Sequence, residues 1–295
     1  MSIPPQQNHL KSSHYASKSL RNTHSSYRDH YSTTTSTKPD PDETRLIPNA
    51  RLATSNTSMP NDPSLKSTWR HRAWVTSGFI TLLITLAKSL ATSIKTQIWV
   101  EPILSFLAGY ILADLGSGVY HWVIDNYGGP NTPLVGAQIE GFLRHHKQPW
   151  RITKIQFANN LHELGRAVTF TVLPMDLVLH DPTKLAFIGS LAGFVMFSQQ
   201  SHAWSHVTKS KLPKIVVVLQ DVGVLLPRWL HAEHHRPPYN GNYCIVSGLC
   251  NKFLDENKVF EVLEKVVFYK FGLRPRSWDE PSFEPIEDDV TISSS

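Results

Sequence analysis

The chain has 295 residues, of which 41% are hydrophobic and 18% charged, with a formal net charge of +5 and a pI near 9.1. This length allows one or two domains. The Lys and Arg residues stand at the ends of apolar segments and form no long patch, which argues against nucleic acid as a partner. The two cysteines, Cys244 and Cys250, provide neither a disulfide framework nor a CxxC pair.

Residues 1 to about 70 are polar, rich in Ser and Thr, and almost without large apolar side chains. Such a segment cannot bury enough surface to offset the entropy of ordering, so the sequence predicts a disordered leader over 1–70. Four basic residues precede its first acidic one, Asp29. A basic, serine-rich and acid-poor leader is typical of an organelle transit peptide, and an ordinary disordered tail is the alternative.

Residues 71–275 are predicted to form a membrane-embedded domain, followed by an acidic, flexible tail over 276–295. Two segments, 73–94 and 98–124, are long enough to span a bilayer. Two shorter ones, 168–179 and 185–197, become a third and a fourth candidate span when they are extended to Leu161 and Trp204.

The segment 215–226 carries Asp221 and ends at Pro227, so it is predicted to be an interfacial or re-entrant helix. The expected fold is therefore an all-α bundle of about four transmembrane helices with a histidine-rich cap on one face.

One face of this predicted bundle receives most of the flanking charge. With four crossings it holds the start of the first helix, the 125–160 connection, the end of the fourth helix and the C-terminus. The opposite face receives only Lys95 and Lys184. The positive-inside rule makes the basic face cytosolic or stromal. An aromatic belt is expected at the same interface, formed by Trp122, Trp150, Trp204 and Trp229.

Eight histidines lie in four clusters on that basic face. They are His121, His145, His146, His202, His206, His231, His234 and His235. Spacings of three and four residues put clustered side chains on one face of a helix turn. Imidazole suits iron, copper and zinc alike, and one zinc needs about four ligands, so eight histidines indicate two metal ions.

Two acidic residues accompany His121 in the second span. Asp114 lies two turns before it and Asp125 one turn after it. An acidic group inside a span is costly and is therefore functional by default. Both carboxylates could accept the second ring N–H of a ligating imidazole, whereas local capping is the alternative for Asp114.

His162 and Glu163 begin an HExxH pattern, but the fifth residue is Arg166, so a metalloprotease of that type is not supported. His162 remains a candidate ninth ligand. Asn160 and Asp221 are further candidates for an extra ligand or a supporting contact.

A two-metal, all-histidine centre on a membrane face indicates oxidation of a lipid chain. Removing hydrogen from an unactivated methylene requires O2 and two electrons, and two ions can share the oxidising equivalents. A di-iron lipid hydroxylase would use the same ligands. Outside the enzymes, a non-catalytic membrane metal-binding protein, acting as a sensor or carrier, is the rival hypothesis.

Four sequence blocks carry a resemblance to a known family: YHWVIDNYGGP, FLRHHKQPWRIT, SQQSHAWSH and LQDVGVLLPRWLHAEHHRPPYNGNYCIVSG. They resemble the lipid desaturase family, which includes plasmanylethanolamine desaturase and the plant chloroplast palmitoyl-phosphatidylglycerol desaturase. The FANNLHELGR stretch and the serine-rich leader are similar to the plant branch.

This resemblance implies a membrane di-iron desaturase whose iron ligands are the eight clustered histidines. In the plant branch, the reaction introduces a trans double bond at carbon 3 of palmitate at the sn-2 position of phosphatidylglycerol. The expected partners are then phosphatidylglycerol, the membrane, O2 as co-substrate and a ferredoxin-type electron donor. The expected location is a chloroplast membrane, with the active site facing the stroma.

Overall fold

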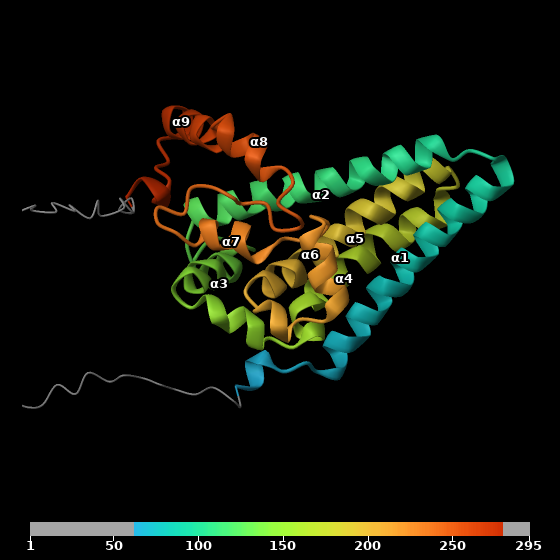
Figure 1. Ribbon diagram of the computed structural model, residues 1–295, viewed down its shortest axis with the longest axis horizontal. Helices are drawn as coiled ribbons and strands as arrows, with labels where there is room; N and C mark the ends of the chain where they lie inside the picture. Colours follow the sequence, from blue (N-terminus) through green and yellow to red (C-terminus); the bar gives the residue numbers. More distant parts are fainter. Residues whose placement is uncertain (1–61, 280–295) are drawn as a thin grey trace, which may run out of the picture. The chain divides into compact units, whose positions relative to one another are not determined.

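The computed structural model describes residues 62–279, which are helical and contain no strand (Figure 1). The predicted leader up to residue 61 and the tail from residue 280 lie outside the described residues. Residues 62–70, which the sequence analysis assigned to the disordered leader, are folded: Leu65 is buried, and the backbone N–H of Ser67 donates to the side chain of Gln156 at 2.7 Å. The α-helices are α1 (Trp69–Thr96), α2 (Val100–Asn126), α3 (Gly136–Lys147), α4 (Phe157–Val178), α5 (Pro182–Ser205), α6 (Lys214–Asp221), α7 (Arg228–His234), α8 (Asn251–Glu256) and α9 (Val259–Phe271). Four short 3-10 helices accompany them: η1 (Pro63–Leu65), η2 (Pro149–Lys154), η3 (Lys209–Lys211) and η4 (Arg276–Trp278).

The four longest helices form a bundle, in which α2 packs on α5 and α1 packs on α4 (Figure 1). Short turns at 97–99 and 179–181 join α1 to α2 and α4 to α5. Both α2 and α5 therefore run away from these turns and end at the opposite end of the bundle. That end carries α3 and α7, and we call it the cap end.

Two of the described helices, α1 and α2, are long and apolar enough to cross a membrane. Their outer faces expose large apolar side chains such as Leu83 and Leu90 on α1 and Leu104 on α2, as a surface that contacts lipid requires. The helices α4 and α5 are also long, at 22 and 24 residues. At 1.5 Å per residue they reach roughly 33 and 36 Å, the thickness of a hydrocarbon core.

Polar contacts between helices explain the single charge in the first apolar segment. Lys88 on α1 donates to the carbonyl oxygens of Asp176 and Leu179, at the C-terminal end of α4. These are carbonyls that the helix itself leaves unpaired, and a cation there also matches the negative end of the helix dipole. Thr85 adds a hydrogen bond of 2.7 Å to the Asp176 carboxylate.

The contact between α1 and α4 depends on glycine. A Cβ atom on Gly78 would lie 2.9 Å from the backbone of Gly165, and one on Gly165 would lie 2.8 Å from the carbonyl oxygen of Trp74. Only residues without a Cβ allow the two backbones to approach this closely.

The predicted interfacial helix is shorter than expected. α6 ends at Asp221, because Gly223 adopts a φ of +77° and the next amides turn back to the carbonyl oxygen of Leu219. Its exposed side includes Ile215 and Val218.

The aromatic-belt prediction is wrong for Trp122. Its ring is buried, packs against Phe260 of α9, and donates from Nε1 to Glu264 at 3.2 Å. By contrast, Trp150 and Trp229 are exposed, as an interfacial belt requires. A tryptophan near a membrane surface can also be buried by a neighbouring helix. For Trp122 that helix is α9, which covers the indole ring with Phe260.

The C-terminal segment is folded up to Trp278. Arg276 of η4 donates to backbone carbonyls at the end of α2, including Ile124 and Asp125 at 2.6 Å each. Residues 276–278, which the sequence assigned to the flexible tail, therefore close the C-terminal end of α2.

Candidate metal centre

The structure brings all eight predicted histidines together at the cap end. Four helices and their C-caps supply them: His121 from α2, His145 and His146 from α3, His202 and the C-cap residue His206 from α5, and His231, His234 and the C-cap residue His235 from α7. The C-terminus of a helix carries partial negative charge, so four such ends converging on one place favour a cation.

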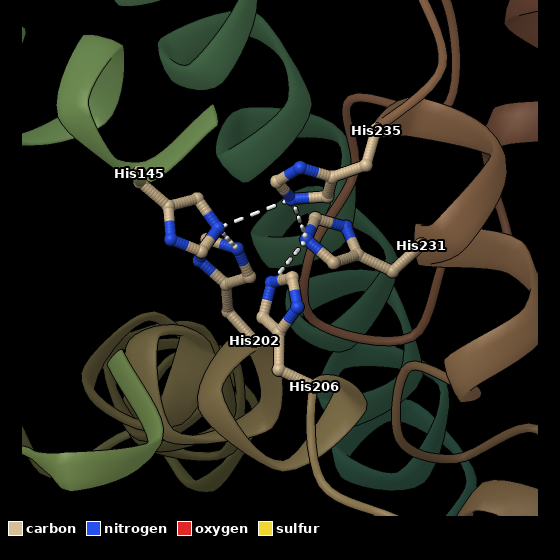
Figure 2. Close-up of side chains that lie close together, drawn as sticks. All are labelled: His145, His202, His206, His231 and His235. Atoms are coloured by element: carbon tan, nitrogen blue, oxygen red, sulfur yellow. Dashed lines mark hydrogen bonds between the residues drawn. The ribbon is translucent and has the colours of Figure 1, made fainter. Parts of the chain in front are cut away.

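Five of the histidines form one group, which we call the five-histidine group (Figure 2). Their Nε2 atoms make successive contacts of 3.0 to 3.1 Å, which run in order through His202, His145, His235, His231 and His206. The rings come from α3, α5 and α7, and they point toward a common centre.

Hydrogen bonding among imidazoles does not account for this arrangement. A neutral ring nitrogen donates one proton or accepts through one lone pair. Nevertheless, the Nε2 atoms of His145, His231 and His235 each face two other Nε2 atoms. Converging imidazole nitrogens are a donor set for a transition metal, and one cation at their centre would satisfy all of them. The residues therefore fit a metal ion.

Burial keeps these imidazoles neutral. It lowers the pKa of His145 to about 2, to which the neighbouring His206 contributes. It also lowers the pKa of His206 to about 4, with a smaller effect from Arg228. Neutral imidazole is the form that ligates a metal, so these donors are available at physiological pH.

The other three histidines surround a carboxylate, and together they form what we call the carboxylate group. The Oδ2 atom of Asp125 lies 3.2 Å from Nε2 of His121 and 3.4 Å from the Nε2 atoms of His146 and His234. All four donor atoms lie within 4.8 Å of one another. The two groups are adjacent, because the ring centroids of His231 and His234 are 5.5 Å apart.

Two backbone carbonyls fix the tautomers in the carboxylate group. His121 donates from Nδ1 to the carbonyl oxygen of Tyr243 at 2.9 Å, and His234 donates from Nδ1 to that of Gly241 at 2.8 Å. A carbonyl can only accept, so each Nδ1 carries the proton and each Nε2 keeps its lone pair toward Asp125. These two partners could not be predicted from the sequence, because a residue of any type supplies a carbonyl.

Unpaired buried atoms indicate that the carboxylate group also fits a cation. Both carboxylate oxygens of Asp125 and the Nε2 atom of His121 are buried, and none has a hydrogen-bond partner among residues 62–279. A buried carboxylate without donors is costly, and a metal ion bound to it removes that cost.

Asp125 therefore differs from its expected supporting role. It was expected to accept the outer N–H of an imidazole, but it lies on the Nε2 side of three rings. This places its carboxylate beside the nitrogen atoms that would bind a metal.

The structure places three other candidates outside both groups. His162 stacks on His71 at 4.0 Å and bonds through Nδ1 to the carbonyl oxygen of Asn159. Asp221 forms an exposed ion pair with Lys209. Asn160 donates to the carbonyl oxygen of Gln199 and the side chain of Gln200.

Asp114 supports a loop and not an imidazole. Its Oδ1 atom accepts the backbone N–H groups of Ser247 and Gly248 at 2.8 and 2.9 Å, and its Oδ2 atom accepts that of Cys250 at 3.0 Å. The expected contact with a ligating histidine is replaced by this cap on the loop that follows Tyr243. The three backbone N–H groups of this loop need hydrogen-bond acceptors, and the buried Asp114 carboxylate provides them.

We expect Asp114→Asn to lower the free energy of unfolding by about 3 kcal/mol. The amide keeps one acceptor but directs its NH2 group at a backbone donor, so a charge-assisted hydrogen bond is lost and a buried N–H is left unpaired. The melting temperature of the purified protein in detergent measures the effect. Asp181→Asn at the N-cap of α5 is the matched control and should change little, because Asn caps a helix as well as Asp. Equal melting temperatures for the two variants would contradict the role of Asp114.

The chain is similar to a family model described as the lipid desaturase domain over residues 110–278. It is 58% identical to "Fatty acid desaturase 4, chloroplastic" of Arabidopsis thaliana, over 86% of this chain and 87% of that protein. It is also 49% identical to "Fatty acid desaturase 4-like 1, chloroplastic" of the same plant, over 87% of each chain.

A more distant relative is also named as a desaturase. A plasmanylethanolamine desaturase of Myxococcus xanthus is 33% identical, over 65% of this chain and 72% of that protein. No solved structure matches the chain. The matched region contains all eight histidines and Asp125.

Proposed function

The chain belongs to the lipid desaturase family and is an oxidoreductase that acts on lipid acyl chains; we propose that it is a membrane di-iron desaturase that uses O2 and two electrons per turnover. The observation that carries the di-iron proposal is the pair of adjacent groups: five imidazoles in one, three imidazoles and a carboxylate in the other. Nitrogen-rich sites with a carboxylate are typical of non-haem iron.

In this proposal the histidines and Asp125 are the ligands. When bound, the two irons supply the oxidising power that removes two hydrogens from adjacent methylenes. The protein's own contribution is to hold nitrogen donors neutral by burial, to fix the rings of His121 and His234 through backbone carbonyls, and to exclude bulk water. Asp125 adds the one negative charge among the donors, which partly offsets the charge of the metal at the carboxylate group.

We further propose phosphatidylglycerol as the substrate lipid, with a trans double bond introduced at carbon 3 of palmitate at sn-2, and a ferredoxin-type protein as the electron donor. The support is the similarity to three plant proteins named as chloroplastic fatty acid desaturases, which are 49% to 58% identical to this chain. The basic residues near the cap end, such as Lys147 and Lys154, suit an acidic electron carrier.

A lipid profile tests the reaction. We expect a bacterial host that contains phosphatidylglycerol and a reducible ferredoxin to accumulate trans-3-hexadecenoate at sn-2 when it expresses the chain. Gas chromatography with mass spectrometry of the separated phospholipids measures it, and a host with the empty vector is the control. A hydroxylated palmitate instead would favour the hydroxylase hypothesis. An unchanged profile with labile zinc in the purified protein would favour the metal-binding hypothesis.

For location, we propose that the predicted leader contains a chloroplast transit peptide that ends before the folded residues 62–70, that the domain predicted over 71–275 is membrane-embedded and that the cap end faces the stroma. The support is the leader's composition, the chloroplastic names of the relatives and the excess of basic residues at the cap end. The four long helices all cross the membrane in this proposal.

Import of the full-length chain into isolated chloroplasts tests these points together. We expect a shortened, membrane-integrated product.

Single cysteines at Lys95 and Lys184, beside the two bundle turns, should react with an impermeant thiol reagent from the side opposite to a cysteine at Asn131. Only Cys250 needs to be replaced beforehand, because Cys244 is buried. Labelling of Lys184→Cys and Asn131→Cys from one side would show that α4 and α5 do not span the membrane.

A further inference from the structure

A cavity of about 240 Å³ reaches the five-histidine group from the side of α3. Its walls come from α3, η2, the start of α4 and the end of α5. His145 and His202 line it, together with the apolar side chains of Phe142, Ile152 and Ile155. The cavity therefore combines a largely apolar lining with direct access to two of the proposed metal ligands.

Two arginines also line this cavity. Arg144 comes directly before His145 on α3, and Arg151 lies on η2. About half of the Arg144 side chain is exposed, and it pairs through Nη2 with Glu140 one turn earlier. A guanidinium has five N–H donors, so this pairing leaves others for an anion. Arg151 is more deeply placed and bonds to Asp62 at 3.0 Å.

Exposed aromatic side chains beside the cavity suit the level at which lipid head groups lie. Trp150 of η2 and Phe157 at the start of α4 border this part of the cap end, and both are exposed. Aromatic side chains of this kind gather where hydrocarbon meets head groups. An arginine beside an apolar cavity at this level faces phosphate, which it recognises well through paired N–H donors.

We propose that this cavity holds the carboxyl end of the substrate acyl chain of an anionic diacyl phospholipid, while Arg144 binds the phosphate of the same molecule. The proposal rests on the function proposed above, since it assigns the substrate's place at that centre. Arg144 and His145 are neighbours in the chain, so the anchored phosphate and the proposed metal are held close together. The reacting carbon must then lie only a few bonds from the ester.

Two other cavities suit this substrate less well. One, of about 310 Å³, reaches the carboxylate group beside Asp125 and His146, but its other residues include Lys147 and Arg276. A larger share of its lining is polar than in the proposed cavity, which suits water or a small polar molecule better than an acyl chain. A second, of about 290 Å³, is a groove between α1, α2 and α5 that includes Phe79 and Phe106. It is almost wholly apolar and contains none of the proposed ligands.

A glycine offers a clean way to block the proposed cavity. Gly141 lines it one helix turn before His145, and a Cβ atom there would meet no atom within 4 Å. Gly141→Leu should therefore fill the space without disturbing the backbone of α3, because Leu favours a helix more than Gly does. Gly116→Leu is the matched control, since Gly116 on the exposed side of α2 also has no neighbour within 4 Å.

The test uses the full-length, metal-loaded protein in lipid nanodiscs with phosphatidylglycerol that carries a diazirine near the carboxyl end of one acyl chain. After illumination, mass spectrometry maps the labelled peptides. We expect labels on α3 and η2, a loss of about tenfold or more in Gly141→Leu, and the wild-type yield in Gly116→Leu. Desaturation by the same preparations should follow the same order.

Arg144→Gln provides a second, independent reading. The loss of one exposed charged contact should raise KM for phosphatidylglycerol roughly threefold to tenfold with little change in kcat, and Arg144→Lys should recover part of the loss. If acyl chains of different length are supplied, the double bond should stay at the same distance from the carboxyl group, because the anchor is at that end.

The outcomes separate the two proposals. Labels confined to the groove that contains Phe79 and Phe106, or a Gly141→Leu variant that is labelled and active like the wild type, would overturn the assigned cavity and leave the desaturase function intact. An unchanged KM in Arg144→Gln would remove Arg144 as the phosphate ligand. Labels in the cavity without any double bond formed by the wild type would overturn the proposed reaction and leave the lipid site intact.

Discussion

Replacing His234 by Ala is expected to abolish desaturation, with a loss of more than about a hundredfold. Its Nε2 atom lies 3.1 Å from that of His146 and 3.4 Å from Asp125, and its outer nitrogen is fixed by the carbonyl oxygen of Gly241. The change removes one of four donors in the carboxylate group. His206→Ala should have the same effect on the five-histidine group. Double-bond formation in extracted lipids measures activity, and elemental mass spectrometry of the purified protein measures bound iron.

His162→Ala is the matched control for both variants. His162 is also a partly buried histidine near the cap end, but it stacks on His71 and belongs to neither group. Its removal should leave bound iron and activity close to those of the wild type. Because bound metal also stabilises a fold, the amount of each variant inserted in the membrane must be compared. Full activity in a well-inserted His234→Ala variant would exclude that residue as a ligand.

The second large effect is expected from Asp125→Asn. The amide keeps the size of the side chain but removes the one negative charge among the donors, and its NH2 group can approach the three Nε2 atoms where a metal would be bound. We expect iron in the carboxylate group and desaturase activity to fall by at least about tenfold. The iron content and the lipid profile are measured as for the histidine variants.

Asp221→Asn controls for the chemical change itself. Asp221 is exposed and pairs with Lys209, so an isolated surface ion pair is lost and the effect should be small. If Asp125→Asn retained its full iron content and activity, Asp125 would not be a ligand. The donor set would then consist of the eight histidines alone, as the resemblance to the family implies.

The gathering of the histidines could be predicted from the sequence because three clusters lie at or just after the ends of apolar segments, and the fourth lies in the polar connection on the same face. The spacing of His231, His234 and His235 fixes them on one side of a helix turn, and the charge pattern puts all four clusters at one end. Their division into two groups could not be predicted, because it depends on how α7 lies against α3 and α5.

The placement of Asp125 has a similar explanation. Whether a carboxylate faces the inner or the outer nitrogen of a histidine depends on ring orientation, which the carbonyl oxygens of Tyr243 and Gly241 set from a distant part of the chain. For Asp114 the sequence indicated a buried function but not its partner, since its ligands are backbone N–H groups of residues 247–250. The burial of Trp122 could not be predicted, because no sequence pattern indicates that α9 packs against α2.

The position of α7 has a consequence for how the protein is made. When synthesis has passed α5 and His206, five of the eight histidines are present, but the five-histidine group still lacks His231 and His235, and the carboxylate group still lacks His234. Bringing α7 back to α2 and α3 requires closure of a long loop, which the chain cannot achieve before residues 228–235 have been made. On the proposed ligand set, the newly inserted chain therefore first has neither iron site complete, and a chain that stops before Arg228 can form its four long helices without completing either site.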